Sequence, residues 1–217
     1  HAATPRSGAQ AAPPMRLTPG TPLAASLTFD DAQAPWPIGR LAMAGGLAQL
    51  EWSREVIASD LQVSALLYPP EAGLHPARGS EFEGLHGFLS DSLPEGWGYL
   101  VMRRRLAKLG VQIETLSPLD RLALVGDQGR GALTYLPATA PPPEVESLGL
   151  DALAAESLAI LVGQDGELAA TLATLAGGSG GARPKVHVGF DADGRVSVSD
   201  GEAAQGHEAW IVKFAAT

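Results

Sequence analysis

Apolar and polar side chains alternate in the first part of the chain. From Ala48 to Ser53 every second residue is apolar, which is the period of a β-strand with one buried face. Ile38–Met43 is a suitable partner strand, and Gly45–Gly46 provides a tight turn between the two. The β pattern runs from Leu23 to about Leu67 and predicts a small antiparallel sheet.

Helical spacing replaces this alternation after Phe82. Met102, Leu106 and Leu109 share one helix face because they are four and three residues apart, and Gly110 then ends the helix.

A second helix is predicted from its two ends. Ser117–Pro118 places an N-cap serine before a first-turn proline, and Gly126 stops the helix. Gly131–Leu136 then returns to a strand pattern. Residues 23–136 are therefore predicted to form one α+β domain, a small antiparallel sheet with helices.

A proline-rich segment follows this domain. Three consecutive prolines at 141–143 favour a stiff, extended spacer, so we expect a linker over residues 137–146. Two short helices rich in Leu and Ala are predicted after it, at about 151–162 and 165–176.

The last part of the chain has a strand pattern. Val186–Val188 and Val196–Val198 flank a turn at Asp193–Gly194 and predict a β-hairpin. Ala209–Phe214 is a further strand, with Lys213 placed between apolar residues. Residues 147–217 are thus predicted to form a second part.

Composition and charge narrow the class of function. Lys plus Arg number 15 and Asp plus Glu number 24 in 217 residues, a formal net charge of −9 that argues against a nucleic-acid coat protein. This balance still allows a local basic patch. The absence of cysteine excludes disulfide frameworks, thiolate zinc sites and cysteine nucleophiles.

Targeting signals are missing from the sequence. No apolar run approaches the roughly 18 residues that a membrane span needs, and the Ala- and Pro-rich start lacks the apolar core of a secretion signal. We therefore expect a cytoplasmic protein with no membrane partner, and a disordered leader or tag over residues 1–22.

The glycine run Gly177–Lys185 is the first candidate for chemistry. Its backbone amides could approach a phosphate without obstruction by Cβ atoms, and Arg183 and Lys185 add positive charge. A flexible linker is the alternative interpretation of this run. Lys213 has two interpretations as well, a guard against edge-strand aggregation or the lysine that orients nucleotide phosphates in a kinase.

Two further motifs have structural explanations. The segment from His86 to Trp97 carries a histidine and acidic groups, but it is more typical of a capped turn into a helix than of a metal or acid–base site. Arg103–Arg105 is more typical of a solvated helix face than of a nucleic-acid contact.

Four motifs in this order together resemble HipA-type proteins. The stretch Phe88–Gly96 is similar to the family's F-x-x-L-L-P-E-G signature, and Ser117–Leu133 to its segment ending in G-A-L. Residues 177–185 resemble the loop G-S-S-G-G-A-R-P-K, and Trp210–Phe214 resembles a strand ending in Ile-x-Lys-Phe.

This resemblance implies the N-terminal portion of a HipA-like serine/threonine kinase, the toxin of a type II toxin–antitoxin pair. It implies that residues 147–217 begin a protein-kinase-like N-lobe, and that the complete protein uses ATP and Mg²⁺. The partners implied are a HipB-like helix-turn-helix antitoxin, through it DNA, and a protein substrate. The residues implied to bind nucleotide are Gly180, Gly181, Ala182, Arg183, Pro184, Lys185 and Lys213.

The family also autophosphorylates a serine in this loop. Strict register places Gly178 at that position here, with Ser179 one residue away, so Ser179 is the candidate for loop autophosphorylation.

Kinases place the groups that hold Mg²⁺ and orient the acceptor hydroxyl downstream of the strand lysine. Only Phe214–Thr217 follow Lys213, and no His-Arg-Asp or Asp-Phe-Gly run occurs. We therefore expect no catalytic residue and no metal site in this chain, no activity and no cofactor requirement for it alone, and self-association through an uncovered sheet face. The alternative function is a non-catalytic module that binds protein or DNA through residues 23–136.

Overall fold

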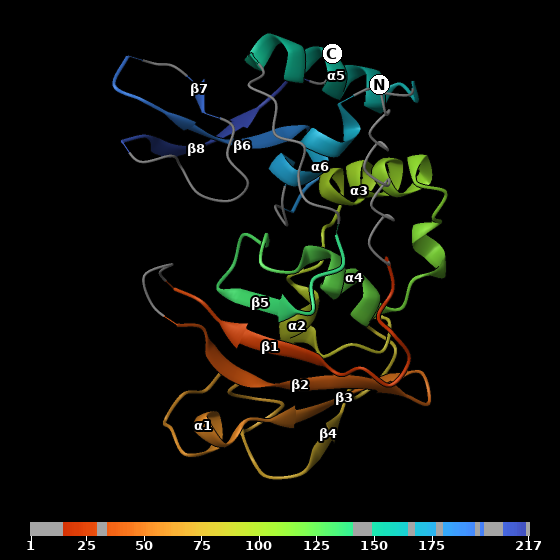
Figure 1. Cartoon of the computed structure of the whole chain (residues 1–217), viewed down its shortest axis with the longest axis vertical. Helices are drawn as coiled ribbons and strands as arrows, with labels where there is room; N and C mark the ends of the chain where they lie inside the picture. Colours follow the sequence, from red (N-terminus) through yellow and green to blue (C-terminus); the bar gives the residue numbers. More distant parts are fainter. Residues whose placement is uncertain are drawn as a thin grey trace, which may run out of the picture.

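A five-stranded antiparallel sheet forms the base of the first part of the molecule (Figure 1). The computed structural model describes residues 15–29, 34–140, 149–164, 168–176, 180–193, 196–197 and 206–215. The sheet has the order β4-β3-β2-β1-β5, and its strands are β1 (Leu23–Leu27), β2 (Trp36–Ala44), β3 (Leu47–Trp52), β4 (Leu74–Pro76) and β5 (Leu133–Leu136).

The predicted hairpin at Gly45–Gly46 is confirmed. Ala44 pairs with Leu47 across this turn, and both glycines have positive φ, at 59° and 80°. Two such residues are what a two-residue hairpin turn requires, because glycine adopts positive φ without steric cost.

The strand pattern predicted up to Leu67 is wrong beyond Trp52. Helix α1 (Arg54–Ile57) begins there, because the Ser53 side chain accepts a hydrogen bond from the backbone N–H of Val56 at 3.1 Å. This local cap turns the chain away from the sheet, and Val56 is fully buried beneath the turn.

Helices cover one face of the sheet. Ala48, Leu50 and Trp52 point into the core, as their alternation predicts, and Leu119 and Leu122 meet them from the helical side. The helical elements of this part are α2 (Gly87–Ser90), α3 (Trp97–Lys108), the short 3₁₀ turn η1 (Ile113–Thr115) and α4 (Pro118–Val125).

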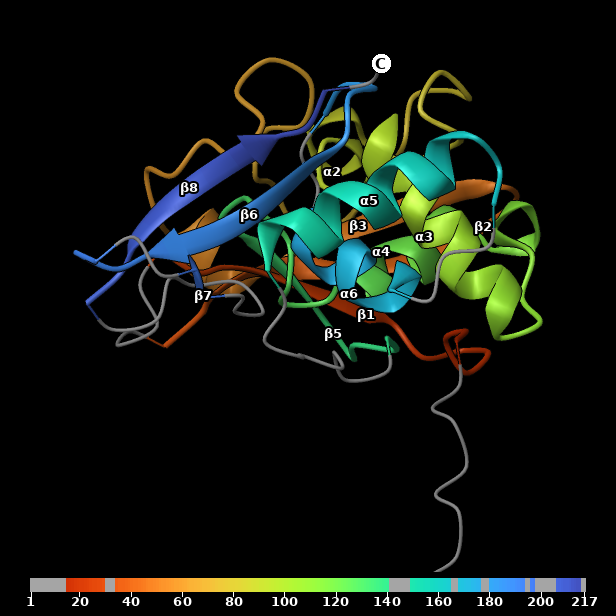
Figure 2. The same cartoon turned by 90° about the horizontal axis from the view of Figure 1, so that it is seen from above.

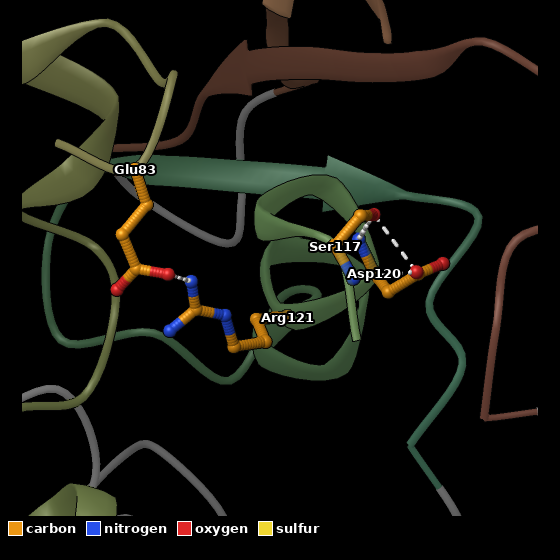
Figure 3. A network of polar contacts seen from close by, with 4 residues as sticks. All are labelled: Glu83, Ser117, Asp120 and Arg121. Atoms are coloured by element: carbon orange, nitrogen blue, oxygen red, sulfur yellow. Dashed lines mark hydrogen bonds and ion pairs between the residues drawn. The ribbon is translucent and has the colours of Figure 1, made fainter. Parts of the chain in front are cut away.

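Helix α4 begins with the predicted serine cap and first-turn proline, and a capping box completes the cap (Figure 3). The Asp120 carboxylate accepts hydrogen bonds from Ser117 N–H at 2.9 Å and from Ser117 Oγ at 2.8 Å. Its other oxygen accepts from Leu17 N–H at 2.8 Å. Arg121, the next residue, forms an ion pair with Glu83.

This network includes Leu17, which belongs to the segment predicted to be a leader or tag. Residues 1–14 of that segment lie outside the described residues, whereas residues 15–22 are packed against the domain. Met15 is buried in a cluster with Leu106 and Leu124, and the Leu17 bond to Asp120 holds the backbone beside α4. Apolar contact and one charge-assisted hydrogen bond thus anchor the entry to β1.

Two helices and a three-stranded sheet form the second part, and each was predicted. The sheet has the order β7-β6-β8 with antiparallel pairing throughout. The elements are α5 (Leu150–Leu161), α6 (Ala169–Ala176), β6 (Lys185–Phe190), β7 (Val196–Ser197) and β8 (Glu208–Lys213). None of the described helices is long and apolar enough to cross a membrane.

Residues 137–140 of the expected linker lie against α4. Thr139 is buried, and its N–H donates to the Ala123 carbonyl at 2.9 Å. Residues 141–146, which include the three prolines, fall outside the described residues.

Helix α3 lies between the two parts (Figure 1), and the view from above shows it beside α6 (Figure 2). Trp97 and Val101 belong to the apolar cluster formed with α5, α6 and β6, whereas Met102 and Leu106 pack with η1 and α4. Pairs four residues apart lie on one helix face, so the two pairs present two different faces of the same helix.

Loss of the Asp120 carboxylate should destabilise the fold. We expect Asp120→Ala to lower the free energy of unfolding by at least about 2 kcal/mol, because it leaves the N–H groups of Leu17 and Ser117 without their acceptor. Urea unfolding followed by circular dichroism measures this change. Asp60→Ala, at an exposed position, is the matched control and should change the value by less than about 0.5 kcal/mol.

Candidate functional site

The end of the glycine run forms a short loop before β6. Gly180, Gly181, Ala182 and Arg183 are exposed, whereas Pro184 and Lys185 are buried. Residues 177–179 lie outside the described residues, so the predictions on Gly178 and Ser179 concern positions that the structure does not describe. Residues 180–185 form this loop, called the glycine loop.

Lys185 turns back beneath the glycine loop. Only 5% of this residue is exposed, and its ammonium donates to the Gly180 carbonyl and, at 3.4 Å, to the Gly181 carbonyl. Gly181 has φ of +93°, and a Cβ there would lie 3.1 Å from the Lys185 ammonium. The backbone conformation thus favours glycine here, and a side chain would also crowd the lysine below it.

Lys213 is directly opposite Lys185 in the sheet. The β6–β8 register pairs these two residues, and Phe214 N–H donates to the Pro184 carbonyl at 2.9 Å. Residues opposite each other in an antiparallel pair share a face. The structure therefore brings together the loop lysine and the strand lysine that the sequence singled out separately. Burial lowers the pKa of Lys185, and the nearby charge of Lys213 lowers it further.

Sequence reasoning missed two residues near this pair, His187 beside Lys185 and Arg130 near His187. His187 is two residues after Lys185 on β6, so it shares the face of both lysines. Burial, with smaller effects from Arg130 and Lys185, lowers the pKa of His187 to about 4. The strand period could have placed His187 beside Lys185. No sequence signal places Arg130 there, because it comes from the loop after α4.

Trp97 is the other residue that the sequence did not assign. Its backbone N–H donates to the Gly181 carbonyl, and its indole Nε1 donates to the Lys185 carbonyl, both at 3.0 Å. The turn before α3 thus contacts both ends of the glycine loop, a role that neither the capped-turn interpretation nor the resemblance to the HipA signature predicted. Gly96, which precedes Trp97 in the same motif, was the sequence feature that could have drawn attention to this turn.

The remaining sequence candidates have structural roles. His86 is fully buried at the start of α2 beside Tyr68, and burial lowers the pKa of its ring. Arg103 forms an exposed ion pair with Glu114 at 3.0 Å, which offsets one charge of the arginine run. Within the described ranges, no three His, Asp or Glu side chains gather as a metal site.

Comparison with known proteins identifies the first part of the chain. Residues 33–136 match the family model of the HipA N-terminal domain. No curated protein and no solved structure gives a match. The match spans β2 to β5 and includes the turn that carries Trp97, and it confirms the HipA-like resemblance. The glycine loop and Lys213 lie outside the matched residues.

The His187 ring should stay neutral well below the usual range for histidine. We expect its ¹⁵N and ¹³C imidazole signals to titrate near pH 4 in the folded chain and near pH 6.5 in urea. Because folding lowers this pKa, the stability that the neutral ring contributes is fully present above pH 6.5. It is lost as the pH falls toward 4. A ring that titrates near pH 6.5 in the folded state would contradict the described surroundings.

Proposed function

Because residues 33–136 of this chain belong to the family of HipA N-terminal domains, we propose that the chain is the N-terminal part of a HipA-like serine/threonine protein kinase. In this proposal the glycine loop and Lys213 contact the phosphates of ATP, which binds with Mg²⁺. The observation that carries the proposal is the pairing of Lys213 with Lys185 at the end of the loop.

The charge arrangement supports a phosphate ligand. Like charges directly opposite in an antiparallel sheet destabilise each other, and an anion between them would relieve that repulsion. In kinases a glycine-rich loop covers the nucleotide phosphates while a strand lysine orients them. Arg183 and Lys213 are both exposed, so they are the cations that arriving phosphates would meet first.

Lys185 has a different role in this proposal. Its ammonium already donates to two loop carbonyls, and it therefore shapes the loop from below. Phosphates would then be held by the exposed backbone of Gly180 to Arg183 and by Lys213, with Lys185 as a nearby buried charge.

The family also suggests the partners. We propose that the protein is the toxin of a toxin–antitoxin pair, that a HipB-like helix-turn-helix antitoxin binds it and links it to DNA, and that the kinase modifies a protein substrate. Direct contact with DNA through Arg103 is disfavoured, because this guanidinium already pairs with Glu114 and the chain carries a net charge of −9.

Substitution of the strand lysine tests the kinase role. In the protein as its gene encodes it, we expect Lys213→Ala to reduce ATP-dependent phosphorylation at least about 100-fold, because a charge at the phosphates is lost. Phosphorylation is measured by mass spectrometry after incubation with Mg²⁺ and ATP.

Lys108→Ala is the control, because Lys108 ends α3 away from the glycine loop. Both variants should unfold at the temperature of the parent protein. Undiminished phosphorylation in Lys213→Ala, with antitoxin binding intact, would instead favour the alternative of a non-catalytic binding module.

A further inference from the structure

The turn before α3 and the glycine loop meet more closely than any other residue type at position 96 would permit. Gly96 has φ of +50°, and a Cβ atom there would lie 2.6 Å from the Gly181 carbonyl oxygen and 2.8 Å from its carbon. Real Cβ atoms do not approach backbone atoms so closely. The loop thus occupies the space that a side chain at position 96 would fill.

Because the turn and the loop lie so close together, Trp97 contacts the loop at two points. Its N–H binds the Gly181 carbonyl near the start of the loop, and its indole binds the Lys185 carbonyl at the end. The residue is only 1% exposed, so both of its donors are shielded from water. Opening the loop would leave these buried donors unsatisfied, which is costly.

The turn itself is fixed to the sheet of the first part. Ser92, five residues before Trp97, hydrogen-bonds through Oγ to the hydroxyl of Tyr135 at 2.7 Å. Tyr135 is fully buried on β5. The turn is therefore held on one side by β5 and on the other side by α3, which packs into both parts of the molecule.

We propose that Trp97 is the positioning residue through which the HipA-like domain sets the conformation of the glycine loop. Gly96 permits the close approach that this contact needs. The proposal rests on the proposed function only for the identity of the ligand, ATP. It assigns the first part of the chain a direct influence on the nucleotide site, exerted through two hydrogen bonds to the loop backbone.

The chain offers a specific probe of loop opening. Lysine occurs only at positions 108, 185 and 213, so endoproteinase Lys-C has three cleavage sites in these residues. The carbonyl of the Lys185–Val186 bond is the one that Trp97 Nε1 binds. Cleavage at this bond therefore requires the contact to open, and its rate reports the open population when reclosing is fast.

Trp97→Phe removes the indole donor and keeps an aromatic ring. In the protein as its gene encodes it, we expect cleavage after Lys185 to become about tenfold faster, with cleavage after Lys108 unchanged. Trp52→Phe is the matched control. Trp52 is 4% exposed in the core of the first part, and its Nε1 has no hydrogen-bond partner among the described residues.

Gly96→Ala tests the close approach separately and decides the question if Trp97→Phe does not fold. Gly110→Ala is its control, because Gly110 also has positive φ, +74°, but a Cβ there meets nothing within 4 Å. We expect faster cleavage after Lys185 in Gly96→Ala and the parent rate in Gly110→Ala.

Two results would overturn the proposal. One is an unchanged rate after Lys185 in Trp97→Phe and Gly96→Ala, and the other is an equal rise in their controls. Protection of Lys185–Val186 by Mg²⁺ and ATP in the parent protein is measured in parallel and tests the nucleotide role alone. Faster cleavage in the two variants without such protection upholds the positioning role and rejects the phosphate ligand.

Discussion

The contact between Trp97 and the glycine loop is the constraint on which the arrangement of the two parts depends. It joins residues 88 positions apart in the chain through the Trp97 Nε1 bond to the Lys185 carbonyl. Helix α3 makes this possible because its residues project on different sides of the helix axis. One face, with Val101, completes the core of the second part, and the other, with Leu106, packs against η1 and α4.

The cationic face of β6 and β8 follows from the same arrangement. Trp97 fixes the Lys185 carbonyl, and the ladder to Phe214 then brings Lys213 opposite Lys185. The His187 ring is neutral there at pH 7, since burial and the neighbouring cations lower its pKa. A chain with a net charge of −9 thus contains a local concentration of positive charge, which a formal sum over the whole sequence does not reveal.

The HipA-like domain supplies the rigid support for this contact. Its sheet holds Tyr135, which fixes the turn through Ser92, while the Asp120 network anchors the entry to β1 beside α4. Both interactions are partly buried hydrogen bonds, and such bonds are partly shielded from competition with water. The glycine loop is therefore attached to a turn that is itself hydrogen-bonded to the sheet of the first part.

Local signals in the sequence were sufficient for most of the elements. The Gly45–Gly46 turn, the Ser117 cap and the alternation in β3 each depend on residues that are neighbours in the chain, and all three are present in the structure. The same kind of reasoning was wrong after Trp52, where the cap formed by Ser53 outweighed the strand pattern and started α1. The HipA-like resemblance, which used the order of several motifs, is confirmed for the N-terminal domain.

The sequence by itself determined the elements, the HipA-like first part and the choice of the glycine loop and Lys213 as candidates. Only the tertiary structure decided that Lys185 faces Lys213, that Arg130 lies near His187 and that Trp97 binds the loop. Hydrophobic period and capping act over a few residues, whereas these contacts join distant segments. Their formation depends on how whole elements pack, and no spacing in the chain encodes that directly.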